Sequence, residues 1–452
     1  MNQGLTIVPP PVVGEALRRL EARGFRAWCV GGCVRDSLLG KAPSDWDIAT
    51  SALPQETKAC FAGERLVEAG AAHGTIAWVP SGDHPIEITT FRSDGAYTDG
   101  RHPDSVAFSR RLEDDLSRRD FTVNAMAWHP QRGLVDLFHG QEDLSAGLLR
   151  CVGEPARRFS EDALRILRCL RFSSQLGFAI HPDTAQALWE KRELLLALSH
   201  ERVREELTKL LCGQGAAAVL RQYAAVVFTV LPELVPMKGC AQETPYHCFD
   251  VWEHTLHAVD YAPQQGDLRW AALLHDAGKP GRKTRSADGV AHFYGHPPES
   301  GRIARQLLTR LRFSNKERDW IAALVDHHED AMPMGEAHLK GLLGRYGERF
   351  VFTLFQLQEA DMSAKAPGVF ARRLPDLEES RALARAILER GDCLTLGDMA
   401  LTGDDLKPLG GAPGPEMGKL LRRLLEAVQR GEAANTPAAL GELAKRLLKR
   451  GL

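Results

Sequence analysis

Two acidic residues near the N-terminus have the spacing of a divalent-cation site. Asp45 and Asp47 flank Trp46 in the segment DWDIAT. If this segment is a strand, side chains two residues apart project from one face about 6 to 7 Å apart. Two carboxylates held there repel each other unless a cation lies between them, and hard oxygen ligands suit Mg²⁺. Two such ions can activate a 3′-hydroxyl and stabilise a leaving pyrophosphate, so the segment predicts a catalytic metal site.

A glycine pair precedes these carboxylates. Gly31 and Gly32 follow the apolar segment RAWCV and leave backbone N–H groups bare where a helix begins, which is an arrangement that holds phosphate groups. Arg35 adds a guanidinium fork for the same anion. Taken alone, a DxD pair is usually a turn or a cap and a glycine pair is usually a tight turn. Their combination at this spacing predicts a nucleotide site.

Bulk composition limits the kind of protein that carries this site. At 452 residues the chain is too long for one ordinary core, so about three domains are expected. The hydrophobic fraction of 44% and the charged fraction of 26% are those of a globular protein. A net charge of −2 argues against a general nucleic-acid binder. Nine cysteines without a CxxC pair predict reduced thiols and a cytoplasmic location. We find no signal peptide and no apolar segment long enough to cross a membrane.

The elements that position the first site alternate between helix and strand. Residues 12–24 form an amphipathic helical pattern that Gly24 ends. TIAWVP and HPIEITTF predict a hairpin joined by the turn residues SGD. In the second strand Glu87 alternates with Ile86 and Ile88, so its side chain is expected to point away from the core.

From about residue 159 the pattern is almost wholly helical. Apolar residues at three-to-four spacing in EDALRILRCLRFSSQLG, DTAQALWEKRELLLAL and HERVREELTKLLCG predict helices that end at glycine or polar turns. Near the C-terminus, KLLRRLLEAVQR and AKRLLKR are basic and helical in pattern. Such runs are usually solvated helix faces, and the alternative is a surface that holds RNA phosphates.

Several motifs in order resemble a known family. GGCVRDSLLG with DWDIAT, then RRDFTVNAM (118–126), then EDALRILRCLRF (161–172) resemble the bacterial-type, class II, tRNA nucleotidyltransferase and poly(A) polymerase family over about the first 210 residues. The resemblance implies a polymerase-beta-like head in which Asp45 and Asp47 hold the metals. Glu87 would be the third carboxylate, and a solvated strand residue is an equal alternative. The residues implied to hold the triphosphate and ribose are Gly31, Gly32, Arg35, Arg119, Asp120 and Asn124.

A polar pair in the third motif predicts how a base is selected. Asp162 and Arg165 are three residues apart, so on one helix they share a face. Aspartate accepts hydrogen bonds and arginine donates them. Cytosine and adenine each offer an amino donor beside a ring acceptor, whereas guanine and uracil present the reverse order. The pair therefore fits C and A without a nucleic-acid template, the alternative being a surface salt bridge. The resemblance assigns both positions to nucleotide selection and places Arg168 among the nucleotide-binding residues.

The second half of the chain resembles the HD phosphohydrolase superfamily. VWEHTLHAV, LLHDAGKP, FYGHPPESGRIA, LVDHHED and LQEADMSAK follow in order. Imidazole and carboxylate ligands suit divalent transition metals or Mg²⁺ at a site open to water and phosphate. The resemblance leaves open whether the domain hydrolyses a substrate or is a helical body packed against tRNA. The implied ligands are His254, His275, Asp276, His296, either His327 or His328 with His327 taken first, and Asp361.

These observations predict an α+β nucleotidyltransferase head (1–150), a helical neck (151–235), an HD-type helical domain (245–365) and a C-terminal helical tail that binds tRNA (366–452). The expected activity is addition of C, C and A from CTP and ATP to the tRNA 3′ end, with Mg²⁺ in the head and a second divalent metal in the HD-type domain. A segment between the hairpin and RRDF looks like the full flexible loop of enzymes that add the terminal A.

Other functions stay open at this point. An A-adding or poly(A)-adding specialist would use ATP alone, although the chain has no strongly basic C-terminal extension. An HD-type phosphohydrolase would act through the histidines, and a non-catalytic RNA-binding protein would have no need for the clustered carboxylates. No membrane and no obligate protein partner are expected.

Overall fold

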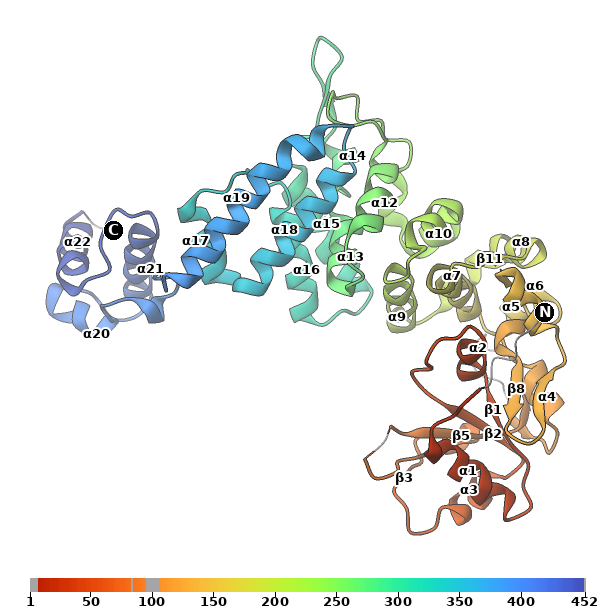
Figure 1. Cartoon of the computed structure of the whole chain (residues 1–452). Coiled ribbons are helices and arrows are strands. Elements are labelled where there is room, and N and C mark those ends of the chain that lie inside the picture. The colour runs from red at the N-terminus through yellow and green to blue at the C-terminus, as the bar shows by residue number, and fades with distance from the viewer. Residues whose placement is uncertain (1–6, 83, 95–105, 451–452) are drawn as a thin grey trace. The chain divides into compact units, whose positions relative to one another are not determined.

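The computed structural model describes residues 7–82, 84–94 and 106–450. The chain divides into two compact units, Met1–Pro232 and Glu233–Leu452. In Figure 1 the first runs from red to green and the second from green to blue. The predicted class is confirmed, because a mixed sheet near the N-terminus is followed by helices. The finer division into four domains stays a prediction.

A mixed sheet forms the head of the first unit. Within the described residues, seven strands pair in the order β3-β4-β5-β2-β1-β8-β9. β2 and β5 pair in parallel, and the other neighbours are antiparallel. The strands are β1 (Ala27–Val30), β2 (Asp47–Thr50), β3 (Leu66–Val67), β4 (Thr75–Trp78), β5 (Ile86–Thr90), β8 (Met126–His129) and β9 (Gly133–Asp136). Short pairs elsewhere are β6 (Arg92–Asp94) with β7 (Val106–Phe108), β10 (Leu148–Leu149) with β11 (Ala179–Ile180), and β12 (Thr284–Arg285) with β13 (Ala291–His292).

The predicted hairpin is the antiparallel pair β4 and β5. Ile86 and Ile88 are buried whereas Glu87 between them is exposed, as the alternation predicted. One turn residue, at position 83, and residues 95–105 of the predicted flexible loop lie outside the described residues. One face of the sheet packs on an apolar cluster that includes Trp28, Phe91 and Leu116.

Helices complete the first unit. The predicted helix at 12–24 is α1. The predicted helix at 161–177 is α7, but α7 begins only at Leu164, and Glu161 is the last residue of α6, which corrects the predicted start of the helix. The helices are α1 (Pro11–Glu21), α2 (Gly32–Leu38), α3 (Pro54–Cys60), α4 (Leu112–Ser117), α5 (Gly140–Ala146), α6 (Pro155–Glu161), α7 (Leu164–Leu176), α8 (Pro182–Lys191), α9 (His200–Leu211), α10 (Ala216–Gln222) and α11 (Ala224–Val230).

The second unit is helical and is organised around α13. This helix is buried on nearly all sides, as its run of apolar residues requires, and it packs against α12, α15, α16 and α18. The helices are α12 (Val251–Tyr261), α13 (Gly266–Leu274), α14 (Lys279–Arg282), α15 (His296–Arg310), α16 (Asn315–His327), α17 (Glu336–Tyr346), α18 (Glu348–Ser363), α19 (Val369–Glu389), α20 (Gly403–Leu406), α21 (Pro415–Gln429) and α22 (Pro437–Lys449).

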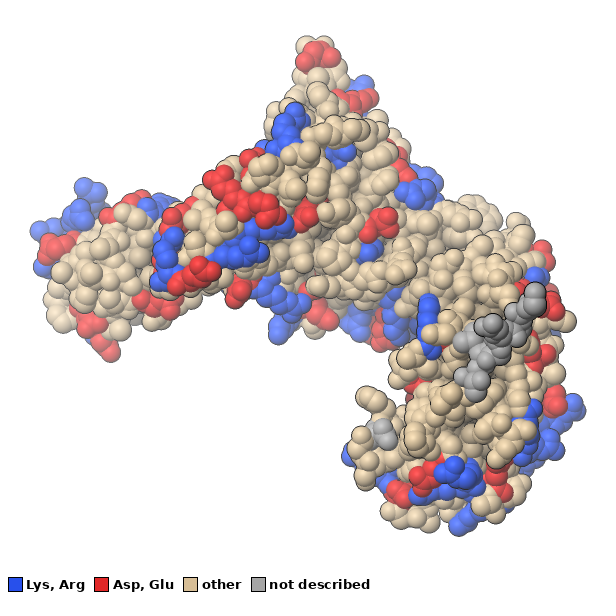
Figure 2. Space-filling model, viewed as in Figure 1, with Lys and Arg blue, Asp and Glu red and all other residues tan. Residues whose placement is uncertain are grey.

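The last helices have a small core of their own. α21 and α22 pack through a cluster that includes Leu406, Leu424 and Leu440. The basic residues of α21 lie outside this cluster and are exposed. Figure 2 shows Lys and Arg interspersed with Asp and Glu over the visible face, in keeping with the small net charge. Among the described residues, no helix has both the length and the apolar character needed to cross a membrane.

Candidate active site and metal centre

Three carboxylates gather where β2 and β5 begin. Asp47 is the first residue of β2 and pairs in register with Glu87 of β5. Asp45 lies just before β2 and is exposed, so only part of the expected strand geometry applies to the pair. Burial, with the charges of Glu87 and Asp45, raises the pKa of the Asp47 carboxyl to about 6. Such repulsion is relieved by a divalent cation, so these oxygen ligands fit Mg²⁺.

The glycine turn lies beside this group and requires glycine for two reasons. Gly31 has a φ of 78°, which side-chain-bearing residues rarely adopt. A Cβ at Gly31 would also lie 2.8 Å from Nη1 of Arg119. The turn therefore lets the Arg119 guanidinium approach the backbone, which brings two of the predicted phosphate-binding groups together.

A chain of hydrogen bonds links the predicted nucleotide-binding residues. Arg35 Nη1 donates to Asn124 Oδ1 at 2.7 Å, and Asn124 Nδ2 donates to Asp120 Oδ1 at 3.1 Å. Asp120 Oδ2 accepts from Arg168 Nη2 at 2.7 Å. Burial alone would raise the pKa of the Asp120 carboxyl, but the Arg168 guanidinium outweighs it and lowers that pKa to about 2. Asp120 is therefore an ionised tie between the head and α7.

Two residues of this region, Asp115 and Phe172, were not identified from the sequence. Asp115 is fully buried and accepts hydrogen bonds from Arg118 at 2.6 Å and from Arg119 at 3.0 Å, so it orients Arg119. Its three- and four-residue spacing to these arginines on a helical segment was a usable signal. Phe172 is buried among guanidinium groups, and no sequence pattern singled it out. The guanidinium carbons near its ring centroid belong to Arg171 at 4.1 Å, Arg35 at 5.2 Å and Arg168 at 5.3 Å.

The structure corrects the geometry of the base-selecting pair. Asp162 ends α6 with an extended backbone, and Arg165 lies in the first turn of α7, so the two do not share one continuous helix face. Asp162 Oδ1 accepts from the Leu164 backbone N–H at 3.1 Å.

Arg165 is buried and held by other groups. It donates to Glu161 Oε2 at 3.0 Å and to the backbone oxygens of Arg158 at 3.2 Å and Arg118 at 2.9 Å. These bonds use three of the five N–H groups of a guanidinium and leave two. The expected alternative, a salt bridge between Asp162 and Arg165, does not form among the described contacts.

A second group of candidate metal ligands lies inside the helical unit. Each of four buried imidazoles uses Nδ1 against a backbone carbonyl, at 2.7 to 3.1 Å, which fixes the ring and turns Nε2 inward. This is the outer-shell arrangement of metal-binding histidines. The potential donor atoms form two sets, and the atoms within each set lie within 4.8 Å of one another. The sets are His254, His275 and Asp361, and Asp276, His296 and His328.

The Asp276 carboxylate lies between the two sets. Oδ2 is 3.3 Å from His275 Nε2, and Oδ1 is 3.2 Å from His296 Nε2. Neither oxygen accepts a well-directed hydrogen bond from the described residues, although the Lys279 ammonium lies 2.7 Å from Oδ2. A buried carboxylate in this state, facing converging imidazole nitrogens, fits a divalent cation.

A cavity adjoins this centre. Its volume is about 630 Å³, and its lining includes Lys365, Arg372 and Arg373. Lys365 Nζ lies 2.7 Å from Asp361 Oδ2, which connects the cavity wall to a candidate ligand. The wall also carries Glu329 and Asp376, so its excess of positive charge is small.

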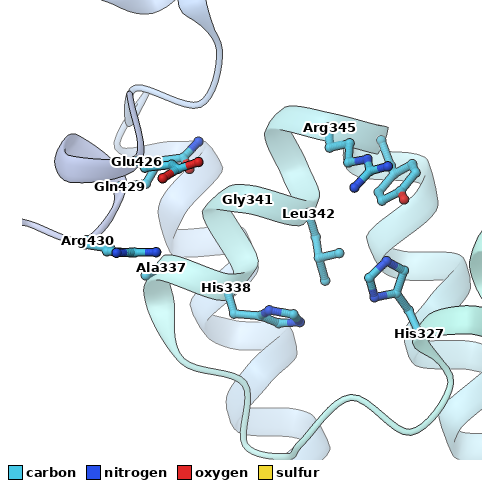
Figure 3. A pocket seen from close by; sticks show the side chains of 10 residues that line it. His327, Ala337, His338, Gly341, Leu342, Arg345, Glu426, Gln429 and Arg430 are labelled. Atoms are coloured by element: carbon cyan, nitrogen blue, oxygen red, sulfur yellow. The ribbon is translucent and has the colours of Figure 1, made fainter. Parts of the chain in front are cut away.

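His327, the residue taken first from the sequence, does not face this centre, and His328 does. Adjacent residues on a helix differ by about 100° in direction, so one of the two must point elsewhere. His327 instead lines a different cavity of about 380 Å³ with His338 and Arg345. Figure 3 shows the rings of His327 and His338 in this cavity, which the end of α21 closes on the other side.

Comparison with known proteins covers nearly the whole chain. The sequence matches the profiles described as Poly A polymerase head domain over residues 27–150, "Probable RNA and SrmB- binding site of polymerase A" over 177–234, and HD domain over 245–369. It is 35% identical to a CCA-adding enzyme of Lactobacillus delbrueckii subsp. bulgaricus, over 94% of this chain and 95% of that protein. It is 33% identical to one of Leuconostoc mesenteroides, over 95% and 94%.

Solved structures show the same relationship. The Bacillus stearothermophilus CCA-adding enzyme in complex with CTP is 31% identical, with a TM-score of 0.75 over 98% of this chain and 99% of that chain. The Thermotoga maritima CCA-adding enzyme complexed with tRNA has a TM-score of 0.56 over 98% and 97%, and at 20% identity it shows the fold alone. The family resemblance seen in the motifs is thus confirmed along the sequence and in the fold. This chain belongs to the family of CCA-adding enzymes.

Proposed function

We propose that this protein adds C, C and A to the 3′ end of tRNA, using CTP and ATP and releasing pyrophosphate. The observation that carries the proposal is the grouping of Asp45, Asp47 and Glu87 beside the glycine turn and Arg119. It lies in a chain that aligns along nearly its whole length with CCA-adding enzymes, which favours full CCA addition over an A-adding or purely hydrolytic activity.

Different residues contact the triphosphate and the base of the nucleotide. Gly31, Arg35 and Arg119 hold the triphosphate, while Asp162 and Arg165 read the edge of the base. Mg²⁺ held by the carboxylates would supply activation of the tRNA 3′-hydroxyl and charge stabilisation of the leaving group. The tie from Arg35 through Asn124 and Asp120 to Arg168 keeps the phosphate-binding and base-reading groups in register.

Two stepwise reactions test this activity. A tRNA that ends at the discriminator base should gain two residues with CTP alone, and a tRNA that ends in CC should gain one residue with ATP alone. UTP and GTP should add nothing. An A-adding specialist would leave the first substrate unextended, and that result would overturn the proposal.

The cluster of Asp45, Asp47 and Glu87 should destabilise the folded protein when no metal is bound. Because the pKa of Asp47 is raised to about 6, the folded state disfavours its ionised form, and stability falls as the pH rises from about 4 to 6. At pH 7 in EDTA, Asp47→Asn should therefore have a larger free energy of unfolding than wild type, by up to about 3 kcal/mol, and should unfold at a higher temperature. The two proteins should converge below about pH 4. Added Mg²⁺ should raise the melting temperature of wild type more than that of Asp47→Asn. Equal melting curves at pH 7 would contradict this account of the site.

The tail helix should contribute to tRNA binding. Lys419, Arg422, Arg423 and Arg430 of α21 or its end are exposed, and we propose that they hold phosphates of the tRNA elbow. Neutralising Arg422 or Arg423 should weaken binding and lower the salt slope of log Kd by nearly one unit for each lost phosphate contact. Lys407→Ala, which removes an exposed charge paired with Asp404, is the matched control. Unchanged affinity and slope in the α21 variants would make this helix a solvated face.

The HD-type centre supports a second activity. The converging imidazoles, the Asp276 carboxylate between them and the adjoining cavity favour a metal-dependent phosphatase or cyclic phosphodiesterase. His275→Ala or Asp276→Ala should abolish phosphate release, while nucleotide addition continues because the two centres use different residues. If the wild type releases no phosphate from a nucleotide panel with Mg²⁺, Mn²⁺ or Ni²⁺, this domain is a scaffold.

Two further expectations, the division into domains and the cellular location, are part of the proposal. A four-part division of the chain is supported by family profiles that end at residues 150, 234 and 369. A cytoplasmic location is supported by the nine cysteines, which are all described and all have free thiols.

A further inference from the structure

The imidazole of His327, which does not face the HD-type centre, belongs to a separate cluster of side chains. His327 is the last residue of α16, and its Nδ1 lies 2.8 Å from Oδ2 of Asp330. His338, in the first turn of α17, places Nε2 at 2.7 Å from the same oxygen. Two imidazoles from different helices thus converge on one carboxylate oxygen, and Figure 3 shows both rings at the same cavity.

We propose that His327, Asp330 and His338 bind a divalent transition metal such as Zn²⁺, Co²⁺ or Ni²⁺, at a site distinct from the HD-type centre. All three donor atoms lie within 4.8 Å of one another. Two imidazole nitrogens and a carboxylate form a donor set that suits these ions better than Mg²⁺. Three protein ligands leave coordination positions open, as in metal sites that also bind water or an anion.

The surroundings of the cluster meet two further requirements of a metal site. The first is access, because the side chains of His327, Asp330 and His338 are 24%, 20% and 46% exposed. They adjoin the cavity of about 380 Å³, which gives an ion a path and leaves room for bound water. The cavity wall also carries Arg345, Arg430 and Glu426, a small excess of positive charge that would favour an anion on the open positions of the metal.

The second requirement is that the ligands are held before the ion arrives. The His327 ring packs edge-on against Tyr346 at 5.6 Å and against Phe350 at 6.1 Å between centroids. The backbone N–H of Asp330 donates to the carbonyl of His327 at 3.0 Å, and the Asp330 carbonyl accepts from Gln358 Nε2 at 3.3 Å. Two of the three ligands therefore lose little further freedom on binding.

The rival explanation is a hydrogen-bonded clasp, in which Asp330 joins α16 to α17 through the two imidazoles and no metal takes part. A clasp requires N–H groups on the facing nitrogens, whereas a metal requires their lone pairs. The two explanations consequently differ in whether the loss of one imidazole changes the number of bound ions.

The experiment counts metal on the full-length protein. Wild type, His338→Ala and Asp330→Ala are dialysed against Co²⁺, and bound metal is measured by elemental analysis and by the visible absorption of Co²⁺. His200→Ala, which removes an exposed histidine of α9, is the matched control, and ions at the HD-type centre are common to all four proteins.

The proposal predicts that His338→Ala and Asp330→Ala each bind one equivalent fewer than wild type, or bind it at least about tenfold more weakly. His200→Ala should match wild type. Zn²⁺ should also raise the melting temperature of wild type more than that of the two variants. Equal Co²⁺ stoichiometry and affinity in wild type and His338→Ala would show that the cluster is a clasp.

Discussion

Replacing Asp45 or Asp47 by asparagine is expected to abolish nucleotide incorporation while tRNA affinity stays within a few-fold of wild type. The charges of Glu87 and Asp45 contribute to the raised pKa of Asp47, and a bound cation would relieve this repulsion. We expect neither carboxylate to be needed to hold the RNA, because an acidic group repels a phosphate. A metal ion contributes several kcal/mol to stabilising a phosphoryl-transfer transition state. Loss of that contribution corresponds to a rate lower by about a thousandfold or more.

The measurement is single-turnover incorporation of CTP into a tRNA that lacks its 3′ end, with tRNA affinity measured separately. Asp183→Asn on α8, where the side chain is 80% exposed, controls for the loss of one carboxylate. Normal turnover in either Asp45→Asn or Asp47→Asn would mean that the DxD segment is a structural turn.

Changing Asp162 or Arg165 is expected to relax the choice of base. On our proposal Asp162 would accept from the amino group of C or A, and Arg165 would donate to the adjacent ring nitrogen through the N–H groups that its protein contacts leave. A site of this kind rejects a mismatched edge by about 10⁴-fold or more, because the wrong base leaves polar groups unpaired. Each variant should also incorporate the correct base more slowly, since the α-phosphate is no longer oriented by the base contact.

The structure shows which substitution of Asp162 tests base selection with the least effect on folding. Asp162→Ala also removes the acceptor for the Leu164 N–H at the start of α7, a loss on the order of 0.5–2 kcal/mol. Asp162→Asn keeps an acceptor for that bond and adds a donor, so it should alter selectivity with less effect on folding. Arg165→Ala should relax selectivity in the same direction.

The double variant should be little worse than either single one, because the two groups act as a unit. Single-turnover incorporation of all four NTPs by wild type and each variant measures this. If the variants keep full selectivity for C and A, the base is read elsewhere and the pair has a structural role only.

Much of the catalytic half was predictable because its signals are local. The alternation of Glu87 with Ile86 and Ile88 fixed the side on which the third carboxylate lies, and the structure places it opposite Asp47. The glycine pair also stood out in the sequence, whereas the approach of Arg119, which requires glycine at position 31, became evident only in the structure. The predictable features are those set by a few neighbouring residues.

The break between α6 and α7 could not be predicted from the sequence. Apolar residues at three-to-four spacing run through residues 161–176 with no glycine or proline before Gly177, so periodicity predicts one helix that begins at residue 161. The break accompanies a contact made across the fold, in which Arg165 donates to the Arg118 carbonyl, and a local bond in which Asp162 accepts from the Leu164 N–H. Tertiary hydrogen bonds of this kind leave no periodic trace in the sequence.

The sequence also could not show whether His327 or His328 is the candidate metal ligand, because this too depends on packing in three dimensions. The two residues are identical and adjacent, and only the rotational phase of α16 decides which one faces Asp276. That phase is set by the packing of α16 on α13 and α15. The partner of His327 in its own cluster, His338, lies beyond a loop, so the cluster becomes evident only in three dimensions.

The most direct test of the proposed function is to sequence the 3′ ends made by the purified protein. The substrate is a tRNA that ends at the discriminator base, supplied with CTP, ATP and Mg²⁺ together. The account predicts that products end in CCA and that extension stops there. Products that end in a run of A, or ends left unchanged while phosphate is released, would contradict it.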